Sequence, residues 1–73
     1  MSMLENVEIE VRLRFGERRL ALREIGELRS GSIVELDKRL NDPAELLLGD
    51  RVVARGEVVI VDGNYGLRVT EVV

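Results

Sequence analysis

The clearest pattern along the chain is a strict alternation of apolar and charged side chains over residues 7–15. Apolar residues occupy every odd position from Val7 to Phe15, and glutamate or arginine occupies every even one. A period of two is typical of a β-strand with one buried face. Gly16 and Glu17 then offer a tight turn, after which residues 18–22 are predicted to return as a second strand.

A short helix is predicted next. Leu22, Ile25 and Leu28 repeat every three residues, which places them along one edge of a helical turn. Gly26 weakens such a helix by about 1 kcal/mol relative to alanine, and the serines around Gly31 end it. Residues 33–36 are predicted as a further short strand, followed by a polar loop to Pro43.

The second half of the chain is predicted to form hairpins. Three leucines at 46–48 lead into Gly49-Asp50, which suits a two-residue hairpin turn, and residues 52–54 leave it. Gly56 interrupts this strand, as expected at a bulge or where another backbone approaches closely. Asp62-Gly63-Asn64 is the strongest turn signal, and residues 67–73 form the last strand.

The predicted fold is therefore mostly β, with five or six short strands and one short helix in a single domain over residues 1–73. A single core in a chain this small rarely supplies more than about 3–5 kcal/mol. The sequence has no cysteine and no histidine, so disulfides and thiolate or imidazole metal sites are excluded. Because 45% of the residues are nevertheless hydrophobic, we expect a second chain to complete the core.

Part of this excess of hydrophobic residues lies at residues 58–61. All four are apolar, whereas a half-exposed strand has one polar face. Such a strand is either buried on both sides or carries an apolar docking surface. A chain of 73 residues has little material to cover both sides, so a homodimer core, a docking patch or both are expected, with Val58 and Ile60 facing one way and Val59 and Val61 the other.

Charge narrows the classes of partner. The formal net charge of −3 argues against a general nucleic-acid binder. Six arginines between Arg12 and Arg29 leave a small dimeric DNA-binding protein as a weaker alternative, because intervening glutamates dilute their field and few aromatics are present to stack on bases. Glutamates at 5, 8 and 10 interrupt the N-terminus, so no signal peptide is expected. No membrane span is expected either, because no apolar run approaches the ~18 residues that one needs.

No catalytic residue, metal or cofactor is expected. Glu35 and Asp37 lie two apart, as in a carboxylate pair for acid and base catalysis, but a solvated strand end is the better interpretation because no polar partners surround them. Oxygen ligands at Asp37, Asn41 and Asp42 do not have the spacing of a calcium loop.

Three segments resemble one known family in order and spacing. Residues 31–37 (GSIVELD) resemble its GSVIELD segment, residues 54–62 (ARGEVVIVD) its ARGEVVVVD segment, and residues 65–71 (YGLRVTE) its closing FGVRITEI. Residues 13–28 resemble its glycine turn, second strand and leading helix, although Phe15-Gly16-Glu17-Arg18 departs from the usual LGRT. The family is the SpoA domain, and the best match within it is the FliN family of flagellar motor switch proteins.

The resemblance implies an intertwined homodimer that exchanges strands in a small barrel-like fold and is not an enzyme. It implies a place in the cytoplasmic ring at the base of the flagellum, peripheral at the cytoplasmic face of the inner membrane. Implied partners are a FliM-type switch protein, a regulator of the export ATPase and the phosphorylated chemotaxis response regulator. The alternative is the equivalent sorting-platform subunit of a type III secretion injectisome.

The resemblance also implies where partners bind. The family's apolar docking patch maps to Val58, Val59 and Ile60, with Leu40 nearby. The remaining apolar strand positions are candidates for the dimer core: Leu46, Leu48, Val61, Leu67 and Val69.

Overall fold

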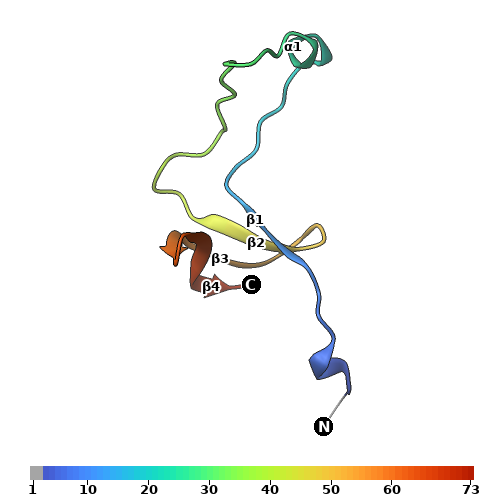
Figure 1. Ribbon diagram of the computed structural model, residues 1–73, viewed down its shortest axis with the longest axis vertical. Helices are drawn as coiled ribbons and strands as arrows, with labels where there is room; N and C mark the ends of the chain where they lie inside the picture. The colour runs from blue at the N-terminus through green and yellow to red at the C-terminus, as the bar shows by residue number, and fades with distance from the viewer. Residues whose placement is uncertain (1–2) are drawn as a thin grey trace.

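One antiparallel sheet of four strands forms the body of the molecule, and a long arm leaves it between the first and second strands (Figure 1). The computed structural model describes residues 3–73, with side chains from Glu5 onward. Its elements, in chain order, are a 3₁₀ turn η1 (Met3–Asn6), β1 (Val11–Arg14), α1 (Leu22–Gly26), β2 (Ala44–Leu48), β3 (Arg51–Val61) and β4 (Asn64–Val72).

The strands lie in the order β1-β2-β3-β4, and every neighbouring pair is antiparallel. Both hairpins predicted in the second half are confirmed, at residues 49–50 and 62–63. Asp62 and Gly63 have φ angles of 51° and 84°. Positive φ at both central residues is the geometry of a type I′ turn, whose twist matches that of the flanking strands.

Gly56 lies where the ladder between β3 and β4 shifts register, as the sequence predicts for a bulge or a close approach. A Cβ atom at this position would stand 2.0 Å from the carbonyl oxygen of Arg68 on β4. The two backbones therefore approach as closely as they do only because residue 56 has no side chain.

Three of the predicted strands need correction. The strand predicted over residues 7–15 is confined to Val11–Arg14, and residues 7–10 are extended but have no strand partner among the described residues. The strands predicted over 18–22 and 33–36 are wrong, because both segments run as irregular legs of the arm. The alternation of apolar and polar residues indicates which face of a segment is buried, but a strand forms only where a neighbouring strand supplies hydrogen bonds. The sheet therefore has four strands, and not five or six.

The arm, residues 15–43, carries α1 near its tip, away from the sheet (Figure 1). The short predicted helix is confirmed, although it spans only five residues, and all of its side chains are exposed. A helix of this length is unstable by itself in water, so burial of its apolar edge against another surface is needed to stabilise it.

Little of the chain is buried in the described structure. Its buried hydrophobic side chains are those of Ala44, Leu47 and Ala54, all on β2 and β3. The radius of gyration is 16.1 Å, against about 11 Å for a compact domain of this length. Within the described part of the chain, none of the helices has both the length and the apolar character needed to cross a bilayer.

Candidate docking and assembly face

The register of the sheet separates a mostly apolar face from one that carries most of the charged side chains, here called the charged face. Residues paired directly opposite each other on neighbouring strands point to the same face, and successive residues alternate. The row that contains Leu13, Leu46 and Ala54 across β1, β2 and β3 continues to Val72 on β4. By the same alternation, four further pairs or rows share this apolar face: Ala44, Gly56 and Val69; Val58 and Leu67; Ile60 and Tyr65; Val11 and Leu48.

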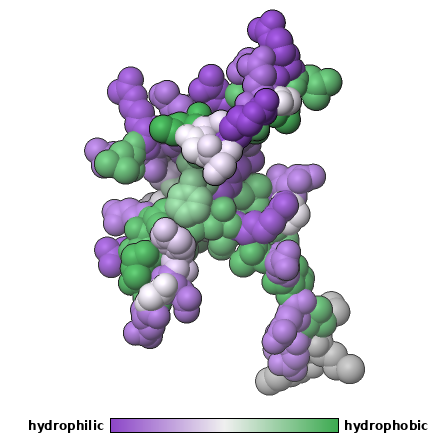
Figure 2. Space-filling view, turned by 45° about the horizontal axis from the view of Figure 1, so that its top comes forward, coloured by the Kyte–Doolittle hydropathy of each residue, from purple (hydrophilic) through white to green (hydrophobic). Residues whose placement is uncertain are grey.

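Most of this apolar face is open to solvent. Ile60, Tyr65 and Val72 are exposed by 65%, 74% and 80%. In the space-filling view, hydrophobic side chains gather in the middle of the molecule and polar ones stand around them (Figure 2). The ring of Phe15 meets that of Tyr65 edge to face, with centroids 6.1 Å apart. The β3–β4 ribbon thus reaches the end of β1, but it leaves much of the face uncovered.

The opposite face carries a row of alternating charges across all four strands. Arg14 on β1 contacts Glu45 on β2 at 2.6 Å, Glu45 contacts Arg55 on β3 at 3.3 Å, and Arg55 contacts Glu71 on β4 at 3.0 Å. The hydrogen bond from Arg14 holds the pKa of the Glu45 carboxyl below its usual value, with a smaller contribution from Arg55. We call these four residues the charge row.

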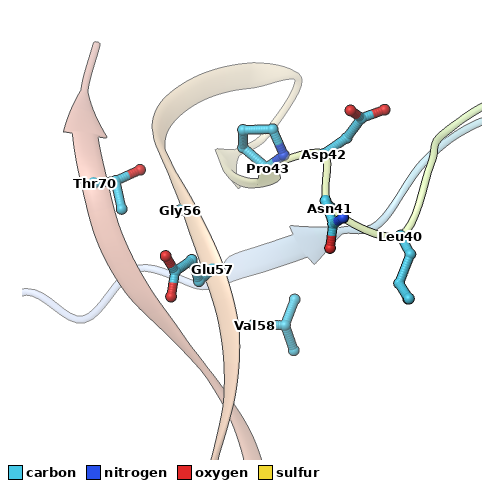
Figure 3. Close-up of a pocket in the computed structure, with 8 residues that line it drawn as sticks. All are labelled: Leu40, Asn41, Asp42, Pro43, Gly56, Glu57, Val58 and Thr70. Carbon is cyan, nitrogen blue, oxygen red and sulfur yellow. The ribbon is translucent and has the colours of Figure 1, made fainter.

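A hollow of about 620 Å³ opens where the arm returns to the sheet (Figure 3). Its lining includes Leu40 and Pro43 from the end of the arm and Val58 from β3. The isopropyl group of Val58 is directed toward the loop that carries Leu40, whose side chain is 100% exposed. Polar groups of Asn41, Asp42, Glu57 and Thr70 complete the rim. An apolar floor with a polar rim suits a side chain or helix of another protein.

The structure brings only part of the predicted patch together. Leu40 and Val58 line the same hollow, and Ile60 follows Val58 on the apolar face. Val59 lies on the opposite face, because successive residues of a strand alternate. Its Cγ2 atom is 3.4 Å from where a Cβ on its strand partner Gly66 would stand, so it points to the same face as that position. Among the dimer-core candidates, Leu46, Leu48, Leu67 and Val69 share the apolar face, and Val61 lies with Val59.

Sequence reasoning missed several members of this site. The burial of Ala44 and Ala54 cannot be predicted from the local sequence, because alanine is small and occurs in buried and exposed positions alike. Counting from the Asp62-Gly63 turn would have paired Tyr65 with Ile60 and so found its place on the apolar face. The same count fails for Val72, because the register shift between Arg55 and Gly56 puts Val72, and not Glu71, opposite Ala54. The charge row needs the pairing of β1 with β2, which no local pattern reveals.

The arm is not a basic surface. Although it carries most of the arginine-rich stretch, its basic and acidic side chains are equal in number. Balanced charges of this kind give no long-range attraction for phosphate. The basic ones are Arg18, Arg19, Arg23, Arg29, Lys38 and Arg39, and the acidic ones are Glu17, Glu24, Glu27, Glu35, Asp37 and Asp42.

A small β-sheet with one charged face, one uncovered apolar face and an arm that extends away from it is the architecture of an assembly module. Comparison with protein families identifies which one. Residues 2–73 match the family described as type III flagellar switch regulator (C-ring) FliN C-term. The chain therefore belongs to the FliN C-terminal family, and the predicted resemblance is confirmed.

Individual relatives come from both flagella and type III secretion. The chain is 39% identical to the flagellar motor switch phosphatase FliY of Bacillus subtilis, over 99% of this chain and 19% of that protein. It is 42% identical to the type III secretion protein HrcQb of Pseudomonas syringae pv. syringae, over 97% of this chain and 53% of that protein. The chain thus spans between about a fifth and a half of these relatives.

A solved structure has the same fold. The C-terminal domain of HrcQb from Pseudomonas syringae pv. phaseolicola superimposes with a TM-score of 0.81 at 40% sequence identity. The match covers 96% of this chain and 97% of the other. The architecture of four antiparallel strands and one short helix is therefore that of the HrcQb C-terminal domain.

Proposed function

We propose that this chain is a non-enzymatic structural module that forms a strand-exchanged homodimer and assembles into the cytoplasmic ring of the flagellar motor switch. The observation that carries the proposal is the apolar face of the sheet, which one chain leaves uncovered. Family membership supports the placement in the switch ring. The ring lies at the cytoplasmic face of the inner membrane, at the flagellar basal body.

The surface area supports a second copy as the occupant of the apolar face, outside the end that carries Val58 and Ile60. The accessible surface is 6818 Å², whereas a compact monomer of this mass exposes about 4,500 Å². An excess of roughly 2,300 Å² per chain corresponds to a total interface of about 4,600 Å², within the range of obligate homodimers. The unpaired extended residues 7–10 and the exposed apolar residues of the arm would pair with, and pack on, the second copy.

Leu40, Val58 and Ile60 are the proposed docking patch for other proteins of the machine. The hollow between Leu40 and Val58 is open to solvent at the end of the sheet where the arm returns. Its occupant is an apolar segment of the FliM-type switch protein or of the export-ATPase regulator, and the phosphorylated chemotaxis response regulator acts on the same ring to set the direction of rotation. Val59, on the charged face, would not belong to the patch.

Leu40→Asp tests the patch most directly, because this side chain is fully exposed and contributes nothing to the core. The variant should remain a dimer by light scattering but bind the FliM-type protein at least tenfold more weakly in calorimetry, since a charged group cannot enter an apolar pocket without losing its hydration. Val58→Asp should act in the same direction. Val73→Asp, another exposed aliphatic residue outside the hollow, is the matched control.

Unchanged binding in both Leu40→Asp and Val58→Asp would refute the docking patch. The same variants, expressed in a strain that lacks the chromosomal gene, should reduce swimming or rotational switching if the machine is a flagellum. The 42% identity to HrcQb favours a second candidate, a sorting-platform subunit of an injectisome. In that case the variants should leave motility intact and reduce secretion of effector proteins.

A further inference from the structure

The two legs of the arm are held together where they leave the sheet. The backbone N–H of Asp37 donates to the carbonyl oxygen of Glu17 at 2.9 Å, and the backbone N–H of Glu17 donates back to Oδ1 of Asp37 at 3.1 Å. One residue further out, Arg18 Nη1 donates to the carbonyl oxygen of Glu35 at 3.2 Å. This reciprocal pair joins segments twenty residues apart, neither of which belongs to a strand.

Gly16 allows the legs to come this close. A Cβ atom on Gly16 would lie 3.0 Å from the Cβ of Lys38 and 3.2 Å from the Cβ of Leu36. Both distances are shorter than ordinary van der Waals contact between carbon atoms. The backbone of one leg therefore packs directly against side chains of the other. We call Gly16, Glu17, Leu36 and Asp37 the hinge clasp.

The charge row connects the hinge clasp to the sheet. Arg14 Nη1 donates to Oε1 of Glu17 at 2.6 Å, and Arg14 Nη2 donates to Oε1 of Glu45 at 2.6 Å. Arg14 is the last residue of β1 and Glu45 the second of β2, so the two strand ends from which the legs depart share one guanidinium. Beyond the clasp the arm extends to exposed apolar residues such as Ile33, which is 92% exposed.

We infer that the hinge clasp holds the arm in the extended position and thereby presents it to a second copy of this chain. The inference rests on the proposed homodimer. Exchange of a segment between copies depends on its hinge, because a flexible hinge lets the segment fold back on its own chain. The two reciprocal hydrogen bonds between Glu17 and Asp37, the close contact at Gly16 and the ion pair from Glu17 to Arg14 on β1 restrict that motion here. The clasp therefore selects the exchanged dimer over a closed monomer.

Asp37→Ala removes the side-chain acceptor of the clasp and is the variant that tests it. The absence of cysteine allows single cysteines to be placed at Ser30, near the arm tip, and at Asn64, the first residue of β4, for spin labels. Labelled chain is refolded with excess unlabelled chain so that the measured distances lie within one chain. The distance distribution should be narrow in the unmutated labelled protein and at least twofold broader in Asp37→Ala, with a larger monomer fraction by sedimentation.

Two matched variants separate the hydrogen bond from the charge. Glu35→Ala removes a carboxylate from the same leg, but only the backbone carbonyl of Glu35 takes part in the contacts above, so this variant should keep the narrow distribution. Asp37→Asn removes the charge but retains an oxygen acceptor, and it should restore the narrow distribution. An Asp37→Ala distribution as narrow as that of the parent protein would overturn the inference.

Hydrogen exchange on the unmutated protein gives a test that does not depend on whether a variant folds. The amides of Glu17 and Asp37 both donate within the clasp, so both should exchange at least tenfold more slowly than in an unstructured peptide. Exchange of both at the unstructured rate would overturn the clasp even if the protein is a dimer. A monomeric parent protein with protected amides would instead refute the homodimer and leave the clasp standing.

Discussion

Gly56 sets a steric limit on the β3–β4 ribbon. A methyl group there would meet the carbonyl oxygen of Arg68 at 2.0 Å, and because that atom belongs to the backbone of β4, the strand itself would have to move. Gly26, at the end of α1, has no atom within 4 Å of its Cβ position. The two glycines therefore respond in opposite ways to the same substitution.

Gly56→Ala should lower the free energy of unfolding by at least about 3 kcal/mol, since it forces two paired backbones apart. Gly26→Ala should raise it by about 0.5–1 kcal/mol, since alanine is the better helix former. Urea unfolding followed by circular dichroism measures both. Equal stability of Gly56→Ala and the parent protein would mean that the register at residues 55–56 is wrong.

The charge row links whole strands to one another. Each member bonds to the next strand across, so the four residues connect β1 through β4 on the charged face. The side chain of Glu45 is only 15% exposed, which limits screening by water. Glu57 and Arg68 form a neighbouring pair at 3.7 Å on the same face, but both side chains are mostly exposed, and exposed pairs contribute about 0–1 kcal/mol.

Acid should weaken the sheet through Glu45. Arg14 lowers the pKa of the folded carboxyl, so the contribution of Glu45 to stability is complete above its unfolded pKa of about 4.3 and is lost as pH falls through the lower folded value. Glu45→Gln should therefore unfold at lower urea concentration than the parent protein at neutral pH. The difference between the two should shrink between about pH 5 and pH 3.

Glu57→Gln is the control for this titration, because it removes a carboxylate of the same type from the exposed pair. Its urea midpoint at neutral pH should lie close to that of the parent protein. A Glu45→Gln midpoint indistinguishable from that of Glu57→Gln would show that the charge row does not stabilise the sheet.

At the scale of the whole molecule, the shape follows from an incomplete core. The molecule extends 53 Å along its longest axis, against 25 and 24 Å along the others, and most side chains of the arm and all those of residues 7–10 are exposed. The apolar edge of α1 and the apolar face of the sheet are both exposed. These surfaces would aggregate or disorder if they stayed in water, and pairing two copies would bury them.

The homodimer should persist at micromolar concentration in 1 M salt, because burial of apolar surface is not screened by ions. Sedimentation equilibrium at low and high salt measures this directly. The melting temperature should also rise with protein concentration, as expected when folding and association are coupled. A monomer of 8.2 kDa at micromolar concentration, at either salt concentration, would refute the proposed assembly.

Local patterns in the sequence determined much of the second half of the molecule. Short turns join strands that are adjacent in the chain, so Gly49-Asp50 and Asp62-Gly63 specify both the hairpins and which strands pair. Gly56 was recognisable as a close approach because a glycine inside an apolar strand has few other reasons to be there. The order and spacing of the motifs then identified the FliN C-terminal family, and the excess of apolar residues indicated that part of the core is supplied by another chain.

The tertiary structure alone decided what the first half does. Residues 18–22 and 33–36 have the pattern of strands, but no strand within one chain pairs with them, so they form the legs of the arm. The pairing of β1 with β2 across the arm assembled the charge row and the hinge clasp. These features join residues that lie far apart in the chain. The periodicity of a segment indicates only which of its faces is buried and does not identify the segment that covers that face.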